Sequence, residues 1–143
     1  MTQPKTILIV GTYDTKAEEL AFIEQVIREQ GGRVISMDVS VLGEIGHPVT
    51  HTRHDVAAAA RSNLAEVISS GDECTAMEIM ARGATALTAR LFRDGVFDGM
   101  ISLGGSMGTD LALDVALALP LGAPKYIVST VAFSAIIAPA RLP

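Results

Sequence analysis

Residues 6–16 read TILIVGTYDTK, and this stretch decides the fold. The apolar run over residues 6–10 is rich in β-branched side chains, which is typical of a parallel strand buried on both faces. Gly11 allows a tight turn after the run, and Thr15 and Glu18 have the spacing of a capping box at the start of a helix. The stretch therefore predicts a strand, a glycine turn and a helix.

The same patterns predict the rest of the chain. The first helix carries Leu20, Ile23 and Ile27 on one face and ends at Gly31-Gly32. Further strands are expected at residues 33–39, 97–103 and 125–130. Further helices are expected to begin at the caps Asp55, Asp72 and Thr109, and to end near Gly71, Gly95 and Leu119. The long loop from Ser40 to His54 has no predicted element, and such loops are often functional.

The order β-α-β-α-α-β-α-β is typical of an α/β fold, namely a Rossmann-like or flavodoxin-like three-layer sandwich. With right-handed crossovers we expect a four-stranded parallel sheet in the order 2-1-3-4. In that order the first and third strands are neighbours, and ligands bind at the carboxyl ends of strands where the winding direction changes. A glycine-rich loop leaves each of these two strand ends, so we expect the loops to face one another across one crevice.

The two loops are GTYDTK at residues 11–16 and GGSMGT at residues 104–109. Glycines at a strand-to-helix turn let backbone N–H groups approach phosphate oxygens, and the helix N-terminus adds partial positive charge. The candidates for phosphate or nucleotide binding are Gly11, Thr12, Asp14, Thr15 and Lys16, with Gly104, Gly105, Ser106, Gly108 and Thr109. Neither loop matches the Walker or the dinucleotide-binding pattern, so a tight connection without a ligand is the alternative.

Asp38 and three histidines are further candidates. Asp38 lies near the end of the second predicted strand, where dinucleotide-binding folds place an acid that contacts ribose, and the alternative is a turn cap. His47, His51 and His54 have no cysteine or paired carboxylate near them in the sequence. Loop histidines that face solvent are therefore favoured over a metal site.

The composition limits the classes of protein to which this chain can belong. The 143 residues are enough for a single domain with a core, and 49% are apolar. The net charge of −5 and the 4% aromatic content argue against a nucleic-acid partner. No run reaches the roughly 18–20 apolar residues that span a bilayer, and the N-terminal run lacks a cleavage site for secretion. The single cysteine, Cys74, fits a reducing cytoplasm, and the apolar residues on its helix face predict a packed thiol.

The sequence holds no recognisable catalytic constellation, which leaves enzymatic activity open. Ser106 is not flanked as in the G-x-S-x-G nucleophile elbow. Asp110 and Asp114 are one helical turn apart in the helix after the second glycine loop, and a role at the helix N-terminus is favoured for Asp110 over cation binding.

Five segments together resemble a known family: ILIVGTYDTKAEEL at residues 7–20, MDVSVLGE at 37–44, AMEIMARGATAL at 76–87, ISLGGSMGTDLAL at 101–113 and PKYIVSTVA at 124–132. This family comprises uncharacterised bacterial and fungal proteins and the tomato mosaic virus resistance protein, whose N-terminal region binds ATP. The resemblance implies a Rossmann-like ATP-binding domain with nucleotide contacts at the two glycine loops. It covers only the first part of a longer family architecture, so a truncated N-terminal part is expected.

We therefore expect a domain that binds ATP, with Mg²⁺ beside the phosphates. The alternatives are an enzyme that acts on a phosphorylated small metabolite in the same crevice, and an interaction module that has lost its ligand. In the plant member the resembling region also engages a viral replication protein. The open edge of the fourth strand and the apolar tail at residues 131–143 predict a homo-oligomer, such as a dimer, or a protein partner.

Overall fold

The predicted sheet is confirmed. In the computed structural model, which describes residues 2–142, four parallel strands lie in the order β2-β1-β3-β4. The strands are β1 (Thr6–Gly11), β2 (Arg33–Asp38), β3 (Gly99–Gly104) and β4 (Lys125–Ser129). Ile9 of β1 lies between Ser36 of β2 and Ile101 of β3, so the two central strands bring their glycine ends to the same edge of the sheet.

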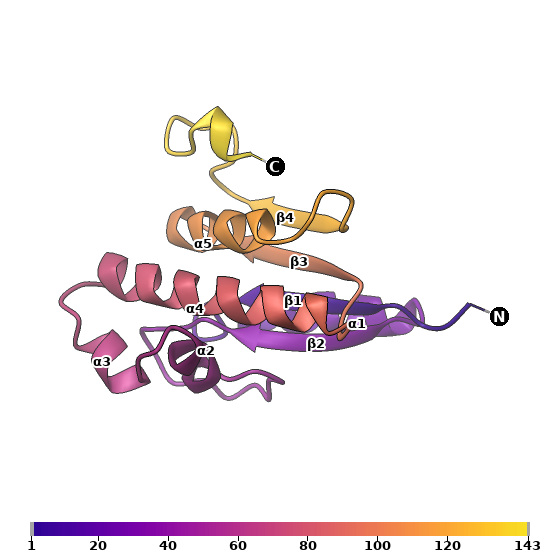
Figure 1. Cartoon of the computed structure of the whole chain (residues 1–143), viewed down its shortest axis with the longest axis horizontal. Coiled ribbons are helices and arrows are strands. Elements are labelled where there is room, and N and C mark those ends of the chain that lie inside the picture. Colours follow the sequence, from indigo (N-terminus) through magenta and orange to yellow (C-terminus); the bar gives the residue numbers. More distant parts are fainter. Residues whose placement is uncertain (1, 143) are drawn as a thin grey trace.

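Helices lie on both faces of the sheet. They are α1 (Ala17–Glu29), α2 (Arg53–Ala59), α3 (Leu64–Ile68), α4 (Glu73–Arg93), α5 (Ser106–Leu117) and the short 3₁₀ helix η1 (Pro139–Arg141). Figure 1 looks onto the face covered by α4 and α5, and α1 lies behind the sheet. The arrangement is the expected three-layer one.

The strand residues alternate between two apolar clusters. Leu8 and Val10 pack with residues of α2, α3, α4 and α5, whereas Ile9 between them packs with Leu20 of α1. All three strand residues are fully buried. This burial on both faces explains why the first strand reads as an unbroken apolar run.

One predicted helix is two helices in the structure. Between α2 and α3 the chain turns at Arg61, whose φ of 60° lies in the left-handed region. Thr52, not Asp55, is the N-cap of α2, and Asp55 completes a reciprocal capping box with it. Asn63 caps α3. The prediction of Asp55 as cap was wrong because the true cap lies three residues earlier, directly after His51, whose amide and carbonyl are hydrogen-bonded to Ser36 and Asp38 of β2.

The helix starts at the two glycine loops also differ from prediction. α1 has Lys16 as its N-cap and no side-chain cap, and the Thr15 hydroxyl lies 3.0 Å from the Thr12 hydroxyl instead of closing a capping box. α5 starts at Ser106 and not at Thr109, which lies inside the helix. The cap at Asp72 is confirmed, since its side chain accepts from the Thr75 amide.

The C-terminal segment lies beyond β4 and folds back onto α5 (Figure 1). The Ser129 hydroxyl accepts from the amides of Val131 and Ala132, which turns the chain away from the strand. Arg141 then pairs with Asp110 at 3.0 Å and with Asp114 at 2.9 Å. Within residues 2–142, no helix has both the length and the apolar character that a membrane crossing requires.

Candidate functional site

The two glycine loops meet at one cleft, at the carboxyl ends of β1 and β3. Its volume is about 230 Å³. Seven of the predicted residues line it: Thr12, Asp14, Thr15, Lys16, Gly105, Ser106 and Gly108. The topology thus joins two segments that are about 90 residues apart in the sequence, as expected at a switch point between adjacent parallel strands.

Asp14 fixes the first loop to the chain that follows β2. Its carboxylate accepts from the amides of Leu42 and Gly43, both at 3.0 Å, and its own amide donates to the Ser40 hydroxyl. These bonds hold residues 40–43 against the first glycine loop. The long loop after β2 therefore forms one wall of the cleft.

Lys16 carries the positive charge of the predicted set. Its ammonium group lies 3.7 Å from the Glu19 carboxylate, and both side chains are well exposed to solvent. An exposed pair of this kind contributes little to stability, because solvent screens it and two long side chains lose entropy. The lysine can therefore exchange this partner for a ligand.

Two adjacent glycines in the second loop, Gly104 and Gly105, differ in how much space a side chain would have. A Cβ at Gly104 would lie 2.7 Å from the backbone of Gly108, so the close approach of β3 to α5 requires glycine there. A Cβ at Gly105 would meet its nearest atom, the Thr130 hydroxyl oxygen, only at 4.0 Å. A side chain at position 105 would therefore meet open space.

The two α-helices that begin at the cleft differ from the other three α-helices in their caps. Thr52, Asn63 and Asp72 each accept a hydrogen bond from a first-turn amide of α2, α3 and α4. Within residues 2–142, no side chain caps α1 or α5, whose N-caps are Lys16 and Gly105. Since the first amides of a helix have no acceptor inside it, α1 and α5 leave uncapped donors and a positive dipole end beside the cleft that their N-caps, Lys16 and Gly105, line.

Some predicted site residues lie behind the cleft and do not line it. Asp38 is fully buried, and its carboxylate accepts from the Tyr13 amide and from the amide and hydroxyl of Ser40, as a turn cap does. Thr109 is buried too, with its hydroxyl bound to the Gly104 carbonyl and the Ser129 hydroxyl. Gly11 and Gly104 pack against their own helices. Through these hydrogen bonds and close contacts, the four residues stabilise the conformation of the loops without lining the cleft.

Sequence reasoning missed the rest of the cleft lining: Val41, Leu42, Glu73, Met77 and Met107. Val41 and Leu42 lie in the loop that Asp14 holds. The length of that loop is a sequence signal that could have indicated a part in the site. Glu73 and Met77 come from the first two turns of α4, and only the packing of α4 against α5 brings them to the cleft. No local pattern marks such residues.

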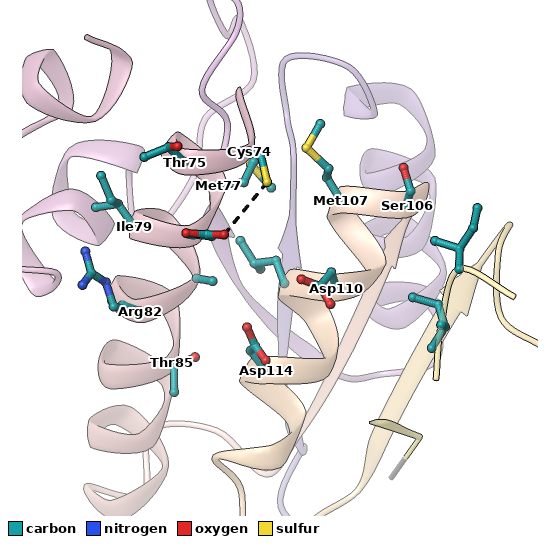
Figure 2. Close-up of a pocket in the computed structure, with 15 residues that line it drawn as sticks. Cys74, Thr75, Met77, Ile79, Arg82, Thr85, Ser106, Met107, Asp110 and Asp114 are labelled. Carbon is teal, nitrogen blue, oxygen red and sulfur yellow. Dashed lines mark hydrogen bonds between the residues drawn. The ribbon is translucent and has the colours of Figure 1, made fainter. Parts of the chain in front are cut away.

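A larger groove adjoins the cleft, between α4, α5 and the C-terminal segment (Figure 2). Its volume is about 830 Å³, and it shares Met77, Ser106 and Met107 with the cleft. Asp110 and Asp114 lie on its α5 side (Figure 2). Burial raises the pKa of Asp114, and the Asp110 charge adds to this against the opposing effect of Arg141.

Cys74 is exposed at the edge of this groove, so the prediction of a packed thiol was wrong. Its Sγ lies on the side of α4 that faces the groove, 4.0 Å from the Glu78 carboxylate, and Figure 2 marks this contact with a dashed line. A nucleophilic cysteine is normally paired with a cation or a histidine, and an acid is the opposite of such a partner.

The three histidines take separate positions. His47 stacks on Tyr13 with ring centroids 5.4 Å apart, and its Nε2 lies 3.5 Å from the Glu24 carboxylate. His51 is half-buried beside Met37 of β2, and burial lowers its pKa. His54 is the one that faces solvent, so the prediction of solvent-facing histidines was wrong for the other two. Residues 2–142 contain no group of three or more potential metal ligands.

Comparison with known proteins gives the family. Residues 5–138 match the N-terminal domain of an uncharacterised protein family, UPF0261, and the chain belongs to this family. A UPF0261 protein of Brucella suis is 51% identical over 141 residues, which are 99% of this chain and 34% of the relative. A UPF0261 protein of Clostridium tetani is 41% identical over 90% of this chain and 32% of its own length.

A plant protein is a more distant relative. The ToMV susceptible protein tm-1(GCR26) of Solanum lycopersicum is 26% identical over 88% of this chain and 19% of its own length. The resemblance seen in the sequence is thus confirmed as family membership. This chain spans about a third of the length of its bacterial relatives, which are named for their family and not for a ligand or a reaction.

Proposed function

We propose that this member of the family binds a nucleoside triphosphate, with ATP preferred, and holds the phosphates in the cleft between the two glycine loops. The observation that carries the proposal is the pair of uncapped N-termini, those of α1 and α5, at one cleft. Such N-termini bind anions because their amides donate to the oxygens and their dipoles favour negative charge.

Side chains complete the anion site. Lys16 supplies a cation, and its exposed pair with Glu19 is given up at little cost. Thr12, Thr15 and Ser106 supply hydroxyl donors around the same cleft. Three kinds of donor thus converge there, which fits the several oxygens of a polyphosphate.

Mg²⁺ belongs to the proposal because two acids, Asp14 and Glu73, also line the cleft. Their carboxylates would repel a bare triphosphate. Mg²⁺ is commonly held by one or two carboxylates together with substrate phosphates, so the acids present fit this ion. Asp14 uses one oxygen for the amides of Leu42 and Gly43, and its other oxygen accepts no hydrogen bond from residues 2–142.

In this proposal the nucleoside lies outside the cleft, because the cleft is small. A cleft of about 230 Å³ is below the roughly 300–1,000 Å³ of typical small-molecule sites, so it takes the phosphates alone. The adjoining groove continues past Met77 and Met107 and is large enough for a nucleoside. Apolar side chains there suit a base, and the carboxylates of Asp110 and Asp114 suit ribose hydroxyls (Figure 2).

Isothermal titration tests the proposal, with ATP, a non-hydrolysable analogue and tripolyphosphate, each with and without Mg²⁺. We expect one-site binding of ATP that requires Mg²⁺. Lys16→Ala should weaken it by about 10–100-fold, the range for a lost hydrogen bond to a charged group. Gly105→Val should abolish it by filling the open space beside the loop.

Lys5→Ala is the matched control. It also removes one exposed lysine, which pairs with Asp98 at 3.5 Å at the amino end of the sheet. We expect no change in affinity for this variant. Flat titrations on a folded sample, or equal losses for both lysine variants, would overturn the proposal. Binding of tripolyphosphate as tight as that of ATP would instead indicate a smaller phosphorylated ligand.

A further inference from the structure

Half of one sheet face has no helix over it. We call it the open face, and it consists of Phe22 of α1, Ile101 and Leu103 of β3, and Tyr126 and Val128 of β4. The sheet register pairs Ile101 with Tyr126 and Leu103 with Val128, so these side chains share one face. Phe22 and Tyr126 are each 66% exposed and Val128 is 47% exposed, which is unusual for large apolar residues grouped on a sheet.

A groove runs along this face between α1 and β4. Its volume is about 640 Å³, and Phe22, Ile23, Leu103 and Val128 supply its apolar lining. α1 packs over β1 and β2 through Leu20, Ile23 and Ile27, and does not extend over β4. β3 is only partly covered, since Ile101 and Leu103 pack against the cluster around Leu20 and remain half-buried. Since strands are spaced by about 4.8 Å, β3 and β4 together have a width of about 10 Å, which is close to the diameter of one helix.

The topology indicates where such a helix must come from. α1 connects β1 to β2 toward one edge of the sheet, whereas α2 to α5 lie in connections that run toward β4. Right-handed crossovers place helices of opposite-running connections on opposite faces. A further connection that continued outward from β4 would therefore add its helix beside α5. Within one chain, a helix over the open face would therefore belong to a connection that returns from beyond the last strand.

The relatives contain chain that can supply this helix. The matched region is 34% of the Brucella suis relative and 32% of the Clostridium tetani relative, and the matched family model is that of an N-terminal domain. In these proteins a long segment thus follows the matched domain. The charged residues that line the groove are Glu18, Glu19 and Lys16, so its charge is negative on balance and basic residues beside an apolar stripe fit it best.

We propose that the open face is the docking site for an amphipathic helix from the region that follows this domain in the longer family members. The helix lies beside α1, covers Leu103 and Val128, and places basic residues near Glu18 and Glu19. The proposal does not rest on nucleotide binding, since Lys16 is the one described residue that lines both the groove and the cleft.

Thiol labelling with peptide-level mass spectrometry tests this. Phe22→Cys is made in this chain with Cys74→Ser, since Cys74 is exposed. A cysteine is also placed at the aligned position of the intact Brucella suis relative. We expect fast labelling in this chain and labelling slower by about tenfold or more in the relative, because a thiol under a docked helix reacts only after local opening.

Leu121→Cys is the matched control, since Leu121 is an equally apolar residue that is fully exposed in the loop before β4. Its thiol should react equally fast in both proteins. Equal rates at position 22 in both proteins would overturn the proposal. So would protection at position 22 in this chain that grows with protein concentration, because a second copy would then occupy the face.

Val128→Thr gives a second, independent readout in the relative. The change keeps a β-branched side chain in the strand but replaces one methyl group with a hydroxyl, which is unfavourable only where a partner buries it. We expect it to speed labelling at position 22 of the relative several-fold and to leave this chain unchanged. No effect in the relative would contradict a helix over Val128.

Discussion

The two faces of the sheet differ in how completely their apolar side chains are buried. On the face of α2 to α5, which we call the closed face, side chains from all four helices and from all four strands form one continuous cluster. On the face of α1, the fully buried members among residues 2–142 are Ile9, Tyr13 and Leu20, and the neighbours of this cluster are partly exposed. The closed face therefore supplies most of the apolar burial that stabilises the domain, and the α1 face remains available for further contacts.

The largest expected effect lies on the closed face. Met80→Ala removes a fully buried side chain of α4 from the large cluster. We expect a loss of about 2–5 kcal/mol in the free energy of unfolding, as for other large-to-alanine changes in cores. Urea denaturation measures it. A loss below about 1 kcal/mol would show that the closed face is loosely packed and would remove the contrast between the faces.

A second change probes how tightly the helices of the closed face approach each other. A Cβ at Gly83 of α4 would fall on the carbonyl oxygen of Val56 in α2. Gly83→Ala should therefore destabilise the domain by about 3 kcal/mol, at the upper end of overpacking effects. Gly46→Ala is the control, because a Cβ there meets nothing within 4 Å. Equal stability of the two variants would mean that α2 and α4 can separate freely.

The cap of α2 should have an intermediate effect. Thr52 accepts from the Asp55 amide and begins the helix that packs on α4. Thr52→Ala should lower the free energy of unfolding by about 1 kcal/mol, the usual effect of losing an N-cap. The measurement is urea denaturation at neutral pH. Unchanged stability would indicate that packing on α4 alone holds α2 in place.

The same capping box gives a small dependence on pH. A hydrogen bond from the Thr52 amide, and a second from its hydroxyl, lower the pKa of Asp55 below its ordinary value of 3.8. A lowered acid pKa adds stability above the unfolded value, and this is lost as the pH falls through the folded value. Asp55→Asn should therefore be less stable than the parent protein at pH 6, with a difference that shrinks below pH 4. A constant difference across this range would contradict the ionic role.

The smallest effect is expected on the open face. Phe22→Ser replaces a side chain that is 66% exposed to solvent. The free energy of unfolding should change by no more than about 0.5 kcal/mol, as for other surface substitutions. A loss comparable to that of Met80→Ala would show that something already packs on Phe22 in solution. The contrast between the two faces would then be wrong for this chain.

Sequence reasoning succeeded where the signal is local. The strand before Gly11, the helix end at Gly31 and the cap at Asp72 each depend on neighbours within a turn, and all three are present. Sequence reasoning failed where contacts between residues far apart in the chain determine the position of a helix end. Thr109 has the chemistry of a cap, but the close approach of β3 to α5 draws its hydroxyl onto Gly104 and Ser129 and lets α5 begin at Ser106.

The candidate site shows the same division. Both glycine loops could be found in the sequence, because glycine after an apolar strand is a short-range signal and the sheet order brings both strand ends together. The position of Asp38 was also found, but not its burial, which depends on the loop that folds back over it. Met77 could not be found, since only the packing of α4 on α5 brings it to the cleft.

The sequence by itself determined the parallel sheet, its strand order and the meeting of two glycine loops at one edge. Apolar periodicity and glycine positions are local properties, and the handedness of crossovers leaves few topologies open. Only the tertiary structure decided which helix N-termini remain uncapped, which acids line the cleft and which half of the sheet lacks a helix. These features arise from contacts between residues far apart in the chain, whose burial and hydrogen bonding no local pattern records.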